Sequence, residues 1–289
     1  MTLRIVTDST CDLPLEAIQA LGITVVPLSI LFGDEELLDG VDIQAEQFFR
    51  RLERDPNMPT TAQPTPALFT HAYQRLIDEG ATEILSIHIS ARLSGTLESA
   101  RQGAQGVEGA RIEFVDSGTV SLGLGTGVME AAKAARAGVD IDAVRAQAED
   151  MFRRTHIFFT VDTLEYLRRG GRMSRGQELL GTLLKVKPIL AIREGEVVPV
   201  GRVRTRRRAI EDIIGRCSDL RPVAHLFVVH STTPEEANYL RDRIAGLDAD
   251  APITVGRITP VVGVHGGPGV LGAGVVTAPD EQSRMIAAK

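Results

Sequence analysis

The segment EILSIHISARLSGTLESARQGAQGVEGARIEFVD, residues 83–116, decides the fold class. An apolar run at 83–89 is followed by a polar loop at 90–96, a helical pattern at 97–106 and a second apolar run at 111–116. Strand, helix and strand in this order are typical of a βαβ unit, in which the strands lie parallel and the helix covers one face of the sheet.

The same alternation continues on both sides of this segment. Upstream, the pattern predicts strands at 3–7 and 23–32, helices at 14–21, 43–54 and 67–79, and a proline-rich loop at 55–66. Downstream, it predicts helices at 120–137 and 141–153. We therefore expect residues 1–154 to form an α/β domain with a mostly parallel sheet flanked by helices.

The remaining residues, 155–289, have a different pattern. Predicted strands at 188–192 and 197–203 flank Glu194-Gly195-Glu196, which is a hairpin signal. Strands are also expected at 156–161, 224–229 and 253–258, helices at 162–169, 206–217 and 235–246, and a last strand after the glycine-rich segment 263–274. We expect a second α/β domain with a mixed sheet that includes a hairpin.

Composition and charge exclude several classes of protein. The chain has 32 Lys and Arg against 38 Asp and Glu, so its net charge of -6 is opposite to that of a nucleic-acid-binding protein. It shows no secretion signal and no apolar run of about 18 residues, so we expect neither export nor an integral membrane protein.

Cys11 and Cys217 are far apart, which argues against a metal site or a disulfide framework and favours the cytoplasm. Because aromatic residues make up only 4%, we expect a core with aliphatic walls.

Two polar loops follow predicted strands, at the edge of the sheet where α/β proteins place their ligand sites. The first runs from Asp8 to Asp12, where Asp12 either caps the next helix or contributes to a site. The second contains Ser94, Gly95 and Thr96, which could hold an anion at a helix N-terminus. Alternatively, a Ser or Thr of this loop only caps the helix. Both roles are compatible, with Ser94 in the site and Thr96 as the cap.

Three further motifs each have more than one interpretation. The glycines at 123, 125 and 127 resemble half of a dinucleotide-binding loop, but their spacing favours close helix packing. The arginines between Arg202 and Arg208 form either a solvated face or a surface for an anionic partner. His265, within His-Gly-Gly-Pro-Gly, lies in a turn or approaches a ligand closely, and it could also serve a serine hydrolase of acyl esters with Ser94. The chain lacks the G-x-S-x-G sequence of such hydrolases.

Seven short motifs, in this order along nearly the whole chain, resemble the DegV family. They are Asp8-Ser9-Thr10-Cys11-Asp12-Leu13, Thr61-Ala62-Gln63-Pro64, Leu93-Ser94-Gly95-Thr96, Val115-Asp116-Ser117, Leu164-Glu165-Tyr166-Leu167-Arg168-Arg169-Gly170-Gly171-Arg172, Lys187-Pro188-Ile189-Leu190 and His265-Gly266-Gly267-Pro268-Gly269. The resemblance implies a bacterial, non-catalytic protein that binds one long-chain fatty acid. It also implies an apolar tunnel in residues 1–154 and a carboxylate cleft closed by residues 155–289.

The resemblance implies a role for particular residues. Thr61, Ser94 and His265 would hydrogen-bond the fatty-acid carboxyl group, with Gly95 contributing its backbone. Position 62, often Ser in the family, is Ala62 here, so Thr61 would carry more of the contact.

Two arginines and a partner protein are implied as well. Arg172 and Arg204 would lie at the mouth of the cleft or contact a partner. That partner would be a separate ATP-binding fatty acid kinase, which converts the bound carboxylate to an acyl phosphate, and transient contact with a membrane surface would fit the same role. The ligand would be the fatty acid itself, without a cofactor.

Overall fold

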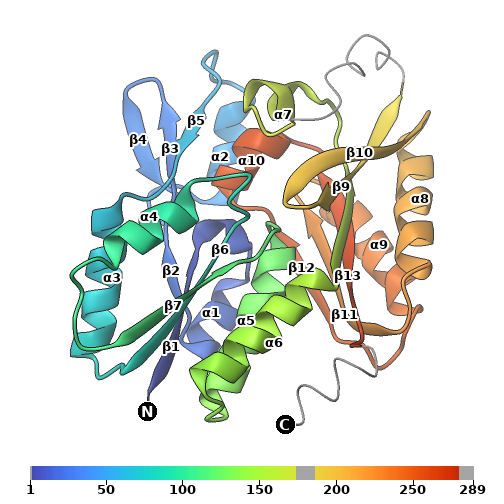
Figure 1. Ribbon diagram of the computed structural model, residues 1–289. Coiled ribbons are helices and arrows are strands. Elements are labelled where there is room, and N and C mark those ends of the chain that lie inside the picture. The colour runs from blue at the N-terminus through green and yellow to red at the C-terminus, as the bar shows by residue number, and fades with distance from the viewer. Residues whose placement is uncertain (1, 174–185, 280–289) are drawn as a thin grey trace.

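The computed structural model describes residues 2–173 and 186–279, which form two large β-sheets with helices packed against them (Figure 1). The first sheet has the order β2-β1-β6-β7, and all its strands are parallel. Its strands are β1 (Leu3–Asp8), β2 (Thr24–Val26), β6 (Glu83–His88) and β7 (Arg111–Asp116). The predicted βαβ unit is confirmed, with α4 (Thr96–Gly103) between β6 and β7.

Helices cover both faces of this parallel sheet. On one face, α3 (Pro66–Asp78) and α4 bury a cluster that includes Phe69, Tyr73 and Ile84. On the other face lie α1 (Leu15–Leu21), α5 (Leu122–Arg136) and α6 (Ile141–Arg153). A parallel sheet of this kind must be covered on both sides, because its strands are apolar on both faces.

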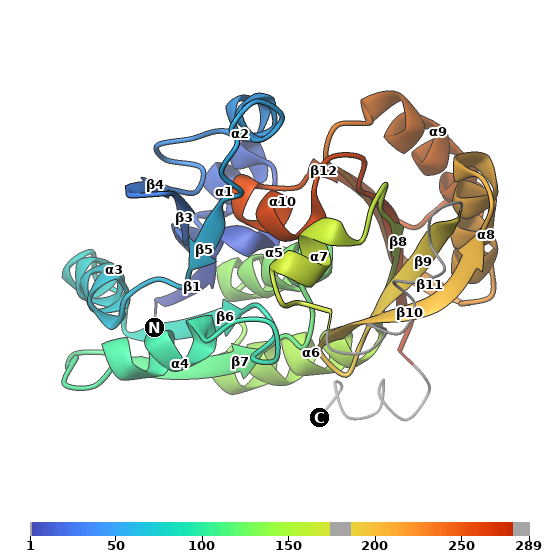
Figure 2. The same ribbon diagram turned by 90° about the horizontal axis from the view of Figure 1, so that it is seen from above.

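The second sheet is mixed, as predicted, with the order β10-β9-β8-β13-β11-β12. Its strands are β8 (Thr155–Thr160), β9 (Lys187–Arg193), β10 (Glu196–Val203), β11 (Val223–His230), β12 (Ile253–Arg257) and β13 (Leu271–Thr277). Only β11 and β12 pair in parallel, and β9 and β10 form the expected hairpin. Helices α8 (Arg206–Ser218) and α9 (Pro234–Ala245) cover one face, while α5 contacts β8, β11 and β12 from the first half of the chain (Figure 2).

A third, three-stranded sheet differs from the sequence-based expectation. It contains β3 (Ser29–Phe32), β4 (Glu35–Leu38) and β5 (Thr60–Ala62), all antiparallel. The single strand expected at 23–32 is wrong: β2 ends before Pro27, which has no N–H to donate, and β3 then joins the small sheet. The expected loop at 55–66 likewise contains β5, and α2 (Ala45–Leu52) lies between β4 and β5 in the chain.

A short helix that the sequence pattern did not predict includes the start of the glycine-rich segment 263–274. Residues Pro260–Gly266 form α10, which begins with proline at its first position, where a missing N–H costs nothing. Gly263 faces Phe48 and Phe49 of α2 so closely that a Cβ atom would collide with both rings. This helix from the second half of the chain therefore packs onto the first half, next to β3 and β5.

Other predictions can be compared directly with the structure. Gly123, Gly125 and Gly127 lie in α5 and leave no room for a Cβ atom, so the close-packing reading is confirmed. Within residues 2–173 and 186–279, no helix has both the length and the apolar character needed to cross a membrane. Cys11 and Cys217 are both buried and unpaired.

Candidate functional site

A cavity lies where the ends of β1 and β6 face the second sheet. Its volume is about 860 Å³ when the solvent space at its open mouth is included. Aliphatic side chains from both halves of the chain line most of it, among them Leu28, Ile89, Val120, Ile157, Val229 and Val261. Its position at the carboxyl edge of the parallel sheet is the usual ligand position in such folds.

Thr61, Ser94, Arg172 and His265 all line this cavity. Thr61 lies on β5, Ser94 lies in the loop before α4, Arg172 follows α7 (Glu165–Arg169), and His265 is in the last turn of α10. Thr61 Oγ1 and His265 Nε2 are 2.9 Å apart and share a hydrogen bond. The structure thus brings four of the six site residues expected from the sequence to one cavity.

Arg172 supplies positive charge at this polar cluster. Its Nε donates to the backbone oxygen of Leu93 at 3.1 Å, and its Nη1 donates to that of Gly170 at 2.6 Å. Burial lowers the pKa of this guanidinium from its usual value, but arginine stays charged in proteins. Because Leu93 precedes Ser94, the first bond also fixes the arginine beside the serine loop.

His265 is neutral in the folded protein at pH 7. Burial, together with the nearby Arg172 charge, lowers the pKa of its imidazole to about 4. Its Nδ1 is buried, has no hydrogen-bond partner among the residues that the structure describes, and lies against Gly170, where a Cβ atom would collide with it. His265 therefore acts as a neutral hydrogen-bonding group, and the positive charge belongs to Arg172.

Ser94 lines the cavity and also contacts the first residue of α4, whose N-cap is Gly95. Its Oγ lies 2.8 Å from Thr96 Oγ1 and accepts the Thr96 N–H at 3.3 Å. The expected role of Thr96 as the cap is wrong, because Thr96 is the first residue of the helix. Gly95 is not among the residues that line the cavity, and the Gln63 side chain occupies the space that a Cβ atom of Gly95 would need.

Arg204 also lies outside the cavity wall. It is an exposed residue between β10 and α8, and it is not among the lining residues in the described part of the chain. Of the nearby arginines, Arg206 is held by Glu236 at 2.7 Å and by the backbone oxygen of Gly269 at 2.7 Å. Arg206 thus has a structural role, and Arg204 presents its charge to solvent.

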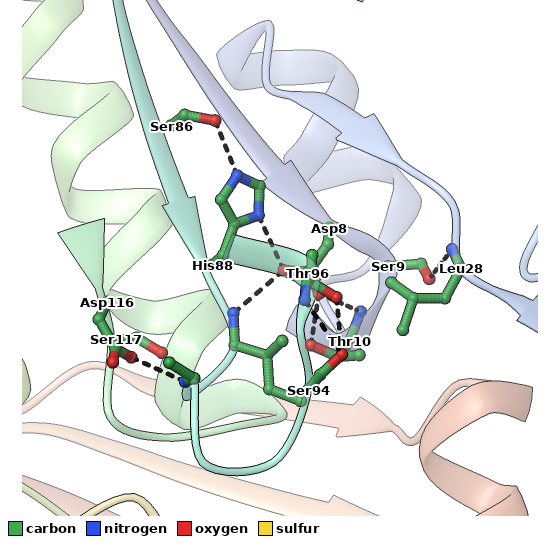
Figure 3. A network of polar contacts seen from close by, with 12 residues as sticks. Asp8, Ser9, Thr10, Leu28, Ser86, His88, Ser94, Thr96, Asp116 and Ser117 are labelled. Atoms are coloured by element: carbon green, nitrogen blue, oxygen red, sulfur yellow. Dashed lines mark hydrogen bonds and ion pairs between the residues drawn. The ribbon is translucent and has the colours of Figure 1, made fainter. Parts of the chain in front are cut away.

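Thr10 lines the cavity although the sequence assigned it no role. Its Oγ1 donates to Asp8 Oδ1 at 2.5 Å, and Asp8 Oδ2 accepts His88 Nδ1 at 2.9 Å and the Ile89 N–H at 3.0 Å (Figure 3). His88 Nε2 continues the chain of hydrogen bonds to Ser86 Oγ at 2.7 Å. The sequence signal for this network was the position of Asp8 at the end of the first predicted strand. The buried hydrogen bonds of Asp8 connect the ends of β1 and β6.

Asp12 joins the two halves of the chain rather than capping α1. Its Oδ2 accepts the Ser121 hydroxyl at 2.5 Å, and its Oδ1 accepts the Thr259 N–H at 2.8 Å. Ser121 also lines the cavity. Burial raises the pKa of the Asp12 carboxyl to about 7, against the lowering effect of these two hydrogen bonds. Thr259 precedes α10, so Asp12 helps to place the helix that carries His265.

The cluster suits binding of an anionic head group better than nucleophilic catalysis. A serine hydrolase needs its serine hydrogen-bonded to a histidine that a third group orients. Here His265 bonds to Thr61 instead of Ser94, and no side chain within residues 2–173 and 186–279 bonds to its Nδ1 to orient it. Two hydroxyls, a neutral imidazole and a guanidinium can together hold a carboxylate at the edge of an aliphatic cavity.

The fold and this site define an α/β protein whose two large sheets enclose an aliphatic ligand cavity with one polar cluster. The chain belongs to the DegV family, because the family model described as "Uncharacterised protein, DegV family" matches residues 2–278. DegV domain-containing proteins of Deinococcus radiodurans and Streptomyces coelicolor are 40% and 39% identical to it, over 276 and 275 residues. These alignments cover 94% and 93% of this chain and 97% and 96% of the relatives.

Solved structures of the same family match the fold closely. A DegV family protein from Thermus thermophilus, described by its fatty acid binding, has 34% identity and a TM-score of 0.88, covering 96% of this chain and all of its own. DegV from Bacillus subtilis, described as a fatty acid binding protein, has 29% identity and a TM-score of 0.86, covering 96% and 99%. Both descriptions are of binding proteins and not of enzymes.

Proposed function

We propose that this protein binds one long-chain fatty acid in the cavity between its two large sheets. The acyl chain would lie along the aliphatic walls, and the carboxyl group would contact Thr61, Ser94 and His265 beside Arg172. The observation that carries the proposal is that one aliphatic cavity includes all four of these polar side chains in its wall. The fatty-acid-binding relatives from Thermus and Bacillus support the same ligand class.

The free energies of burying an acyl chain and a carboxylate agree with separate roles for the aliphatic walls and the polar side chains. Burial of about 15 methylene groups at roughly 0.8 kcal/mol each contributes on the order of 12 kcal/mol before entropy losses. A buried carboxylate without hydrogen bonds would cost several kcal/mol, so hydroxyl donors and a nearby cation are needed. The acyl chain would supply most of the affinity, and the polar cluster would fix the orientation.

The proposed ligand position differs from the expectation that residues 1–154 alone enclose the acyl chain. The wall includes Ile157, Ile192, Val229 and Val270 from the second half as well as Ile89 from the first. We retain residue 154 as the proposed domain boundary, since the parallel sheet ends before it and the mixed sheet begins after it. The cavity would then lie between two domains.

We further propose that the bound carboxyl group is presented to an ATP-binding fatty acid kinase in the cytoplasm. The kinase would transfer the terminal phosphoryl group of ATP to a carboxylate oxygen, while this chain holds and orients the fatty acid. Exposed Arg204 would contribute to the docking surface, and Arg172 would stay with the carboxyl group. The order of the seven DegV motifs along the chain supports this assignment.

Mass spectrometry tests the binding proposal directly. The purified protein, measured under native conditions and again after organic extraction, should release one fatty acid per chain. A protein without fatty acid that also takes up neither oleate nor palmitate would contradict the proposal. Incubating the oleate-loaded protein with a candidate kinase and ATP should then produce oleoyl phosphate, and its absence with every kinase that forms a complex would contradict the partner assignment.

A further inference from the structure

The tip of the β9–β10 hairpin is not paired with the neighbouring strand β8 of its sheet. Residues of β9 and β10 pair along the whole hairpin, but β8 pairs with β9 only at Phe158–Ala191 and Phe159–Leu190. β10 is the outermost strand, so no further strand of the described sheet supports it. Residues 192–197, which we call the hairpin tip, are therefore not paired with β8.

This hairpin tip forms part of the cavity wall. Ile192 and Val197 pair with each other at its base, and both line the cavity. Between them, Glu194 and Gly195 have φ values of 51° and 79°. Two consecutive positive φ values are characteristic of the tight two-residue turn that follows the twist of a hairpin. The hairpin tip is thus a short, stiff ribbon with one apolar side towards the cavity.

The hairpin tip contacts the loop 90–94, which lines the cavity from the first half of the chain. Buried Ser90 donates its hydroxyl to the backbone oxygen of Gly195 at 2.8 Å. Arg92 Nη1 lies 3.6 Å from Glu196 Oε1 and forms an ion pair, in which the Arg92 side chain is 59% exposed and the Glu196 side chain 19%. Leu93 and Ser94 of this loop line the same cavity. The contact between the hairpin tip and the loop 90–94, which we call the seam, therefore lies at the edge of the ligand cavity. It joins two separate parts of the chain.

We propose that the hairpin tip is a strap that closes one side of the acyl cavity and lifts from the loop 90–94 when the fatty acid exchanges. This inference rests on the proposed function. Lifting breaks the Ser90–Gly195 hydrogen bond and the Arg92–Glu196 ion pair, whereas the strand pairs nearer the sheet centre stay intact. The Arg92 side chain of this pair is largely exposed, and pairs with an exposed partner contribute little to stability, so we assign the buried Ser90 hydrogen bond as the main latch.

Crosslinking the seam provides the first test. In the variant Arg92→Cys/Glu196→Cys, bismaleimidoethane would join the loop to the hairpin tip, and the native thiols Cys11 and Cys217 are buried. The measurement is the release rate of bound cis-parinaric acid after excess oleate is added in a stopped-flow fluorimeter. Crosslinking should slow release at least about tenfold relative to the same variant without crosslinker. Equal rates before and after complete crosslinking would overturn the strap.

A hydroxyl deletion provides the second test. Ser90→Ala removes the donor to Gly195, and we expect release to become about 3- to 10-fold faster, the usual effect of one hydrogen bond. Thr70→Ala is the matched control, because Thr70 Oγ1 donates to the Gly103 oxygen at 2.7 Å and is not among the residues that line the cavity. Unchanged release in Ser90→Ala, with both variants folded, would contradict the latch.

The outcomes separate the two proposals. If the wild-type protein carries a fatty acid and takes up parinaric acid, but neither the crosslink nor Ser90→Ala changes the release rate, only the strap is wrong. If the wild-type protein carries no fatty acid and binds no parinaric acid, the proposed function is wrong and the strap is overturned with it.

Discussion

Thr61 and His265, which are 204 residues apart in the chain, share a hydrogen bond of 2.9 Å between Oγ1 and Nε2. The bond joins β5 of the small sheet to α10, so it crosses from the first half of the chain to the second. Both residues also line the aliphatic cavity. The polar end of the cavity therefore forms only when the two halves of the chain have packed together.

Thr61→Val should weaken fatty-acid binding by about 10- to 100-fold. The substitution keeps the shape but removes the hydroxyl that bonds to His265 and, in our proposal, to the carboxylate, and a hydrogen bond to a charged group contributes about 1.5 to 3 kcal/mol. Thr60→Val is the matched control, since the exposed Thr60 side chain points to the opposite face of β5. Competition with cis-parinaric acid measures both affinities, and equal losses in both variants would contradict the prediction.

Arg172→Met should reduce the preference of the protein for a fatty acid over the matching alcohol. Loss of the bonds to the Leu93 and Gly170 oxygens affects both ligands alike, so the ratio of their affinities isolates the guanidinium charge. We expect oleate affinity to fall about tenfold more than oleyl alcohol affinity, as calorimetry can measure. Arg204→Met, with its exposed side chain, should leave both affinities unchanged. An unchanged ratio in Arg172→Met would show that the arginine does not contact the carboxylate.

Gly170→Ala should weaken fatty-acid binding by displacing His265. The backbone φ of Gly170 is -71°, which alanine adopts readily, so the effect would come from the collision between its Cβ and His265 Nδ1. Gly215→Ala in α8 is the control, because nothing lies within 4 Å of a Cβ atom there and alanine favours a helix by up to about 1 kcal/mol. Ligand titration should show weaker binding for Gly170→Ala alone, while thermal unfolding should show Gly215→Ala at least as stable as wild type.

His265 should make the free protein less stable as the pH falls from about 6.5 to 4. Its pKa is about 4 in the folded chain and near the usual 6.5 when unfolded, so in this range the unfolded state binds the additional proton. The full shift corresponds to about 3 kcal/mol. Urea unfolding of wild type and His265→Gln at pH 7, 5.5 and 4 should show wild type losing stability relative to the variant. A difference between them that does not change with pH would contradict the assigned pKa.

Much of the fold follows from local sequence patterns. The apolar and polar pattern of residues 83–116 predicts β6, α4 and β7 nearly within their observed bounds, and Glu194-Gly195 predicts the β9–β10 turn. These features depend on backbone preferences and side-chain periodicity within a few residues, which a sequence displays directly. The motifs also indicated six candidate site residues, and four of the six line the cavity.

Contacts between distant segments decided the rest. Residues 23–32 are mostly apolar, yet they divide at Pro27 between two sheets, because the partner strands β1 and β5 lie elsewhere in the chain. The glycines around His265 suggested a turn, but packing of Gly263 against Phe48 and Phe49 stabilises α10. Local propensity is weak beside such tertiary packing, since a short helix gains most of its stability from the surface it buries.

The sequence by itself determined the elements of both large sheets and the chemical types at the site, because periodicity and residue chemistry are local properties. Only the tertiary structure decided that Thr61 meets His265, that Arg172 rather than the histidine carries the charge, and that Gly95 and Arg204 lie outside the cavity wall. Burial sets the histidine pKa, and burial is a property of the packed chain as a whole.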